Sequence, residues 1–151
     1  MSVMSISAFE NFFRLEASLD VDKADLDRYN DCITRKVNDL LIRGEATARA
    51  NARDVIEPHD FPITRGLQES MQALERLDED QDLGLQRVLE ELTAERPIDL
   101  EVSAATEGAL PRVAGGLSVA LARTFKILHP KLRNPQSEQW ERSFRVFNLL
   151  L

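Results

Sequence analysis

The sequence predicts a single compact all-α domain spanning residues 1–151 and made of two similar halves. Apolar residues recur at helical spacing along most of the chain. The same order of elements, a short helix, a long helix and another short helix, occurs twice, about 79 positions apart. Only six glycines and six prolines are present, which leaves little room for flexible linkers.

The first half, residues 1–78, is predicted to contain three helices. Its first helix places apolar residues at helical spacing: Ile6, Phe9, Phe12 and Phe13. The acidic link "SLDVDKAD" then leads into a long helix from about Lys23 to Ala52, which no proline interrupts. At nearly thirty residues this helix is roughly 40 Å long, so we expect it to cross the whole molecule.

The segment "ARDVIEPHDFPI", residues 52–63, connects the long helix to the third helix. Val55 and Ile56 suit a short strand, Pro58 suits a first helical turn, and Asp60 is a candidate cap for the helix containing residues 62–77. Arg53 and Asp60 stand seven positions apart. Both a catalytic loop and a structural joint fit this composition.

The second half, residues 79–151, repeats the pattern. A short amphipathic helix around Leu85–Leu92 is followed by the link "IDLEV" and by a second long helix from about Ser103 to Leu128. The loop "HPKLRNPQ" ends that helix. The last helix carries large apolar residues on one face: Trp140, Phe144, Phe147 and Leu151.

Charge is distributed unevenly along the chain, whose net charge is −7. Residues 1–109 hold 12 basic and 24 acidic side chains, whereas residues 110–151 hold seven basic and two acidic ones. Two interpretations remain open. Either two solvated helical surfaces simply differ, or the acidic and basic parts face each other or different partners.

Composition also limits the cellular location. No apolar run approaches the ~18 residues of a membrane helix, and the first residues lack the pattern of a signal peptide. The single cysteine, Cys32, excludes an intramolecular disulfide and suits a reducing compartment. We therefore expect a cytoplasmic protein without membrane partners, with the nucleoid as a narrower alternative.

Two sets of short, long and short helices, joined by strand-like loops, resemble the histone fold. Histones end their long helix with an arginine and place an aspartate seven residues later, a spacing that Arg53 and Asp60 match. The chain also resembles a bacterial family of unknown function with two histone folds fused in tandem, through "LDVDK", "PITRGLQES" and "RNPQSEQWERSFRVFNLLL". This resemblance implies a tandem histone-fold pair in one chain, a monomeric pseudodimer held by an intramolecular handshake.

In such a handshake the loops of the two halves pair crosswise. The resemblance therefore implies that "LDV" lies beside "KLR" and that "DVI" lies beside "IDL", so the acidic first loop meets the basic last loop. It also implies that Arg53 and Asp60 form a structural clamp and that segment 52–63 is a joint. A second clamp is not expected, because Trp140 stands seven residues after Arg133.

Residues suited to catalysis are few. Glu57, His59 and Asp60 lie close together in "EPHD", but three local ligands without a second cluster do not indicate a metal site. The chain has two histidines and no glycine-rich phosphate loop. We expect no cofactor, no metal and no enzymatic activity, and we expect Cys32 to be a packed side chain.

Two binding functions follow. The first is a macromolecular interaction module that docks a protein partner. The alternative is a nucleoid-associated protein that binds DNA weakly and without sequence preference. Since only the last third is basic, the candidate DNA contacts are Lys131, Arg133, Arg142 and Arg145.

Overall fold

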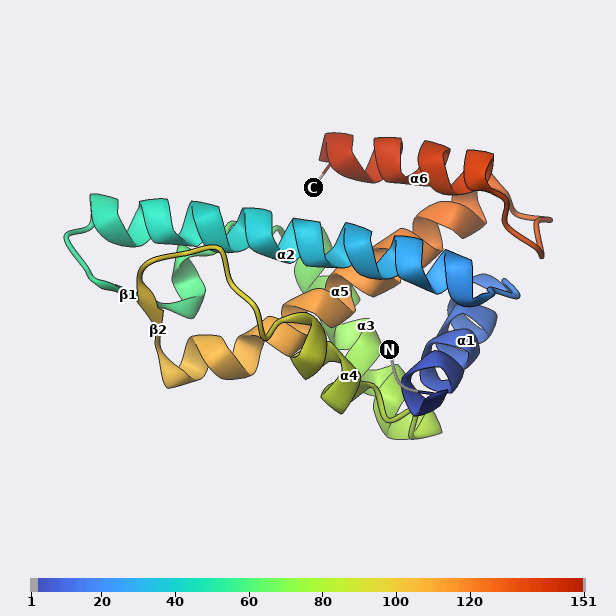
Figure 1. Ribbon diagram of the computed structural model, residues 1–151, viewed down its shortest axis with the longest axis horizontal. Helices are drawn as coiled ribbons and strands as arrows, with labels where there is room; N and C mark the ends of the chain where they lie inside the picture. The colour runs from blue at the N-terminus through green and yellow to red at the C-terminus, as the bar shows by residue number, and fades with distance from the viewer. Residues whose placement is uncertain (1–2, 151) are drawn as a thin grey trace.

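A computed structural model describes residues 3–150, which form six α-helices, one 3₁₀ turn and two short strands (Figure 1). In chain order the elements are α1 (Val3–Ala17), α2 (Lys23–Ala50), β1 (Val55–Ile56), η1 (Pro58–Asp60), α3 (Arg65–Gln81), α4 (Leu85–Leu92), β2 (Glu101–Val102), α5 (Ala104–Leu128) and α6 (Ser137–Leu150). The predicted all-α class is confirmed. Within residues 3–150 no helix is long and apolar enough to cross a membrane.

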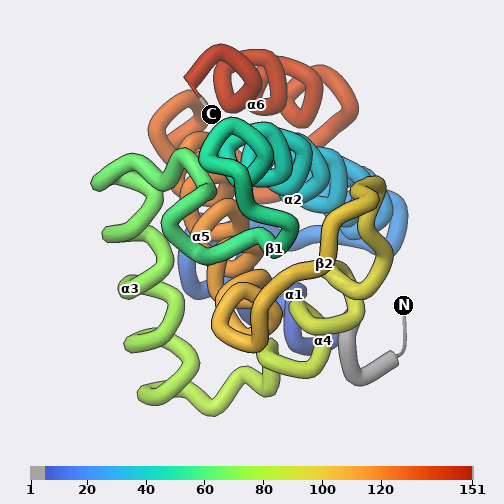
Figure 2. The backbone as a smooth tube through the Cα atoms, turned by 90° about the vertical axis from the view of Figure 1, so that its left-hand side faces the viewer, coloured from blue at the N-terminus to red at the C-terminus, as the bar shows by residue number. Residues whose placement is uncertain are grey.

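The two long helices, α2 and α5, form the centre of the molecule. In Figure 1, α5 crosses obliquely behind α2, α6 lies above one end of α2, and α1, α3 and α4 lie below. Figure 2 shows the same order end on, with α3 and α4 on opposite sides of α5. Each long helix thus packs against elements from both halves of the chain.

An aromatic cluster fills the end where α1, α2, α5 and α6 meet. The ring of Trp140 lies 4.6 Å from that of Phe125 and 5.9 Å from that of Phe13, measured between centroids. Nearby, the hydroxyls of Tyr29 and Ser118 lie 2.5 Å apart in a buried hydrogen bond between α2 and α5. Burial raises the pKa of Tyr29. The two halves therefore share one core.

The first and last residues of α2 are both determined by residues next to the helix in the sequence. Asp22 and Asp25 form a reciprocal capping box, in which each backbone N–H donates to the other carboxylate at 3.0 and 2.8 Å. The helix ends at Ala50, two residues earlier than predicted, because Ala52 adopts a left-handed conformation with φ of 57°.

Helix α3 approaches α5 closely at two adjacent glycines, Gly115 and Gly116. A Cβ atom on Gly116 would lie 3.0 Å from the backbone nitrogen of Met71 and 3.2 Å from the carbonyl oxygen of Leu67. One on Gly115 would overlap the side chain of Leu74. The absence of side chains at these two positions allows the backbones of α3 and α5 to pack together.

The loops of the two halves meet at both ends of the molecule. At one end β1 and β2 form a parallel pair, with Val55 beside Glu101 and Ile56 beside Val102. At the other end the backbone N–H of Asp20 donates to the carbonyl of Arg133 at 2.7 Å. The crosswise placement of loops predicted from the sequence is thus confirmed.

The register of the pairing between β1 and β2 differs from the prediction. The strand opposite β1 is Glu101–Val102 rather than residues 98–100. The reason lies in α2, where the carboxylate of Glu45 accepts the backbone N–H groups of Asp99 and Leu100 at 2.8 and 3.0 Å. These hydrogen bonds hold residues 99–100 against α2 and leave the next two residues to pair with β1.

Candidate functional site

The joint after α2 is organised around the side chains of Arg53 and Asp60. The guanidinium of Arg53 donates to both carboxylate oxygens of Asp60 and to the carbonyl of Val55 at 3.3 Å. The same carboxylate accepts the backbone N–H of Glu57 at 2.8 Å. Asp60 is 3% exposed, whereas the side chain of Arg53 keeps 32% of its surface in water. All of these partners lie within the joint itself.

The predicted capping role of Asp60 is wrong. Pro58–Asp60 form a separate 3₁₀ turn, and α3 begins at Arg65. Thr64 is the N-cap, since its hydroxyl accepts the backbone N–H of Leu67 at 3.2 Å. Asp60 does not cap α3 because both of its oxygens are engaged by Arg53 and Glu57.

The Arg53 guanidinium lowers the pKa of Asp60 from 3.8 to about 2, helped by the N–H of Glu57. A depressed folded-state pKa stabilises the protein above pH ~4, and this contribution is lost as pH falls toward 2. We therefore expect the D60N variant to lose less stability than wild type between pH 4 and pH 2. Chemical denaturation across that range measures it, and parallel curves for the two proteins would contradict it.

At the opposite end, Trp140 takes the place that the repeat pattern would assign to a second aspartate. Its indole Nε1 donates to the buried carboxylate of Asp25 at 2.8 Å, which ties α6 to the start of α2. Arg28 adds a hydrogen bond to the hydroxyl of Ser137 at 2.8 Å. Burial raises the pKa of Asp25. Arg133, which has no aspartate seven residues after it, lies with its guanidinium 3.8 Å from the carboxylate of Asp20.

The candidate catalytic residues do not converge. The described residues contain no group of three His, Cys, Asp or Glu side chains able to hold a metal ion. His59 is exposed and lies 4.0 Å from Asp60, whose oxygens are bonded to Arg53. Cys32 is half-buried, and burial raises the pKa of its thiol to about 11. Its thiolate is therefore scarce near neutral pH.

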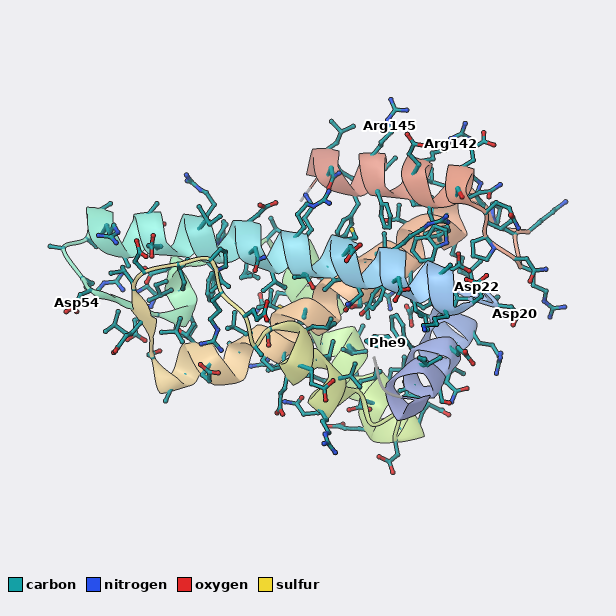
Figure 3. The ribbon with its side chains drawn as sticks, viewed as in Figure 1. Phe9, Asp20, Asp22, Asp54, Arg142 and Arg145 are labelled. Carbon is teal, nitrogen blue, oxygen red and sulfur yellow. The ribbon has the colours of Figure 1, made fainter. Side chains whose placement is uncertain are left out.

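All four candidate DNA contacts are exposed. Lys131 and Arg133 lie in the loop before α6, and Arg142 and Arg145 point outward from α6 (Figure 3). Carboxylates are interspersed with them: Asp20 and Asp22 at the same end of the molecule, and Glu138 and Glu141 on α6. Two other C-terminal arginines are bonded to glutamates, Arg112 to Glu75 and Arg123 to Glu16. Acidic side chains thus lie among the candidate DNA contacts.

An apolar groove lies where α6 ends above α2. Its volume is about 260 Å³, and its walls come from α2, the segment before α3, the start of α3, the middle of α5 and the end of α6. We call it the α6-end groove. The residues that line it are Lys36, Asp39, Leu40, Arg43, Pro62, Thr64, Leu67, Leu117 and Leu150.

Two leucines at the end of α6 are unusually exposed. Leu149 keeps 84% and Leu150 keeps 75% of its surface accessible, although Phe147 is buried as predicted. Leu151, also assigned to the core face, lies outside the described residues. This groove was not predicted from the sequence. Its one local signal is the run "NLLL", which continues past the last aromatic residue.

Similar proteins are known from bacteria. The sequence profile described as "Domain of unknown function (DUF1931)" matches residues 9–148. An uncharacterized protein of Aquifex aeolicus (strain VF5) is 25% identical over 117 residues, which cover 78% of this chain and 67% of that protein. A crystal structure of a protein from Thermus thermophilus has a TM-score of 0.85 and 49% identity, and covers 97% of both chains.

A second solved structure, of a protein from Aquifex aeolicus, has a TM-score of 0.84 at 22% identity. It covers 97% of this chain and 95% of the other. At this low identity the likeness concerns the fold alone, which therefore persists while most side chains change.

Proposed function

The chain belongs to the DUF1931 family of unknown function, and we propose that it is a tandem histone-fold pseudodimer that serves as a non-enzymatic interaction module for a protein partner. The order of helices in each half and the crosswise meeting of the loops support the histone-fold assignment. The Arg53–Asp60 pair supports it further, as a clamp on the loop after the first long helix.

The α6-end groove is the observation that carries the interaction function. It combines an apolar lining with the exposed Leu150, and the neighbouring Leu149 is exposed as well. A contiguous apolar surface rimmed by charged residues is typical of protein–protein contacts, where a few apolar anchors supply most of the affinity. None of the residues that line the groove takes part in the clamp or in the ring contacts of the aromatic cluster.

The proposed activity is binding rather than catalysis. Two buried carboxylates, those of Asp60 and Asp25, take part in structural hydrogen bonds at the two joints, which supports this proposal. We place this function in the cytoplasm, which the lone Cys32 favours. The nucleoid is the matching location for the DNA-binding alternative.

The alternative rests on the exposed cations of the C-terminal third. Phosphate contacts require uncompensated positive charge, and the carboxylate of Asp20, 3.8 Å from Arg133, reduces the positive charge there. We expect duplex DNA to bind with a Kd no better than roughly 10⁻⁴–10⁻⁶ M at physiological salt, and more weakly as salt rises.

The joint change K131A and R133A should abolish this residual binding, as measured by fluorescence anisotropy with a labelled duplex. A matched control is R76A, which removes a cation from the exposed face of α3. Nanomolar, salt-resistant binding by the wild-type protein would show that DNA binding, rather than binding to a protein partner, is the main function.

The internal handshake also predicts the oligomeric state. Because each half already has its partner in the same chain, sedimentation velocity at low micromolar concentration should report a mass close to 17.1 kDa. A dimer that dilution cannot dissociate would mean that part of the surface assigned to the monomer is an interface between chains.

The interaction function is tested by photo-crosslinking in cells of the organism that encodes the chain. A photoreactive amino acid at position 150, in the groove, should give a discrete adduct with another protein. The same amino acid at position 76, on the exposed side of α3, is the control. Mass spectrometry identifies the partner, and the L40Q change in the groove should remove the adduct. No adduct at position 150, or equal adducts at both positions, would overturn the proposal.

A further inference from the structure

We propose that two buried hydrogen bonds between the halves determine which surfaces pair: they favour pairing of the first half with the second and disfavour pairing of either half with a copy of itself. This inference rests on the paired arrangement of the halves in the proposed function. It goes beyond that function because it names the residues that select the partner of each half.

The first of these bonds joins α6 to the start of α2. The indole Nε1 of Trp140 donates to one carboxylate oxygen of Asp25 at 2.8 Å, and the two residues are 1% and 5% exposed. The other oxygen of Asp25 accepts the backbone N–H of Asp22 at 3.0 Å. A buried carboxylate requires such donors, because an unpaired charge in the interior is strongly unfavourable.

The second bond joins the two long helices, where Tyr29 of α2 meets Ser118 of α5. The hydroxyl of Ser118 lies 2.7 Å from the carbonyl of Ala114, to which it donates. The hydroxyl of Tyr29 is therefore the donor in the 2.5 Å contact between the two side chains. Both residues are buried, so the acceptor that Tyr29 needs is supplied by the other half of the chain.

A pair of two first halves would lose both bonds. In the repeat pattern Asp60 corresponds to Trp140, so Asp25 of one copy would face Asp60 of the other. An ionised Asp60 has no hydrogen to donate, and its negative charge would repel that of Asp25. Helix α2 contains no serine, so Tyr29 would also lose the acceptor that α5 provides.

A pair of two second halves would leave Trp140 without its acceptor. The offset that relates Asp60 to Trp140 also relates Asp25 to Ala105, and α5 contains neither an aspartate nor a tyrosine. A buried donor without an acceptor is costly, whereas the pairing within one chain satisfies both bonds. Such selection matters during synthesis, when the first half is complete before its partner in the same chain.

The experiment starts from the folded full-length protein, into which a protease site is placed at residues 82–84, an exposed turn with two left-handed residues. Cleavage after folding keeps every residue and removes the covalent connection between the halves. The cleaved protein is unfolded in urea and refolded, and native mass spectrometry then counts the pairs. Mixed pairs should exceed pairs of identical halves at least about a hundredfold.

Replacing both partners of each bond by apolar groups removes the selection without leaving a buried polar group unpaired. The changes are D25A with W140F and Y29F with S118A. The combined variant should form pairs of identical halves at least about tenfold more often than the wild type. The control I33V trims a fully buried side chain of α2 without removing a polar contact, and should keep the wild-type ratio.

Statistical mixing of the halves in the wild type, or a combined variant as selective as the wild type, would overturn the inference. If circular dichroism shows that the combined variant is unfolded, Y29F with S118A is compared in its place. Neither result affects the proposed binding of a partner, which the crosslink from position 150 tests separately. Absence of any pair after refolding of the cleaved wild type would contradict the paired arrangement itself, and the inference with it.

Discussion

Replacing Asp60 with alanine is expected to lower the free energy of unfolding by about 2–3 kcal/mol. Loss of one partner from a fully buried ion pair costs about 3–5 kcal/mol, and the partial exposure of Arg53 reduces this cost. The change also leaves the N–H of Glu57 without its acceptor. Urea denaturation followed by circular dichroism measures the effect. R53A should shift the unfolding midpoint in the same direction.

Asp54 provides the matched control, because it carries the same charge in the same loop and points outward at the end of the molecule (Figure 3). The D54A change should alter stability by no more than about 0.5 kcal/mol, the usual scale for exposed sites. If D60A and D54A were equally mild, the Arg53–Asp60 pair would not clamp the joint.

Replacing Gly116 with alanine is expected to destabilise the protein by about 1–3 kcal/mol through overpacking. The added methyl would meet the backbone of α3 at Met71 and Leu67, and backbone atoms cannot rotate out of the way as a side chain can. Thermal or urea unfolding measures the change.

Gly108 is the control for this substitution. It lies in the same helix, and a Cβ atom there would meet nothing within 4 Å. G108A should therefore stabilise the protein by about 0.5–1 kcal/mol, since alanine loses less backbone entropy than glycine in a helix. Destabilisation by both changes to a similar extent would show that close packing between α3 and α5 is not the cause.

The sequence was sufficient to predict the helices and their order, because those depend on local periodicity. The apolar spacing of the first helix and the uninterrupted run of α2 are properties of neighbouring residues. The meeting of the loops at both ends followed from the resemblance to a paired fold. These features could be predicted without knowledge of long-range contacts.

Other features depend on contacts that the sequence does not reveal. The register of β1 and β2 is determined by Glu45, whose partners Asp99 and Leu100 lie more than fifty residues away. The cap of α3 is Thr64 because Arg53 engages Asp60, a choice between two suitable residues within four positions. Periodicity could not distinguish these alternatives.

The candidate site was the least predictable part. The four basic residues were correctly expected to be exposed. The carboxylate nearest to Arg133, that of Asp20, comes from the loop before α2, more than a hundred residues earlier. The α6-end groove depends on where α6 stops relative to α2. That is a property of helix packing, which the spacing of apolar residues within one helix does not reveal.

Dividing the chain tests the central claim, that each half requires the other to bury its long helix. A cut after Asp82, where the backbone leaves α3 in a left-handed conformation, separates residues 1–82 from 83–151. At low micromolar concentration neither fragment should show cooperative thermal unfolding by circular dichroism. An equimolar mixture should recover the helical signal and sediment as a 1:1 complex of about the mass of the intact chain. Cooperative unfolding of either fragment alone as a monomer, or a mixture that gives only the sum of its parts, would contradict the account.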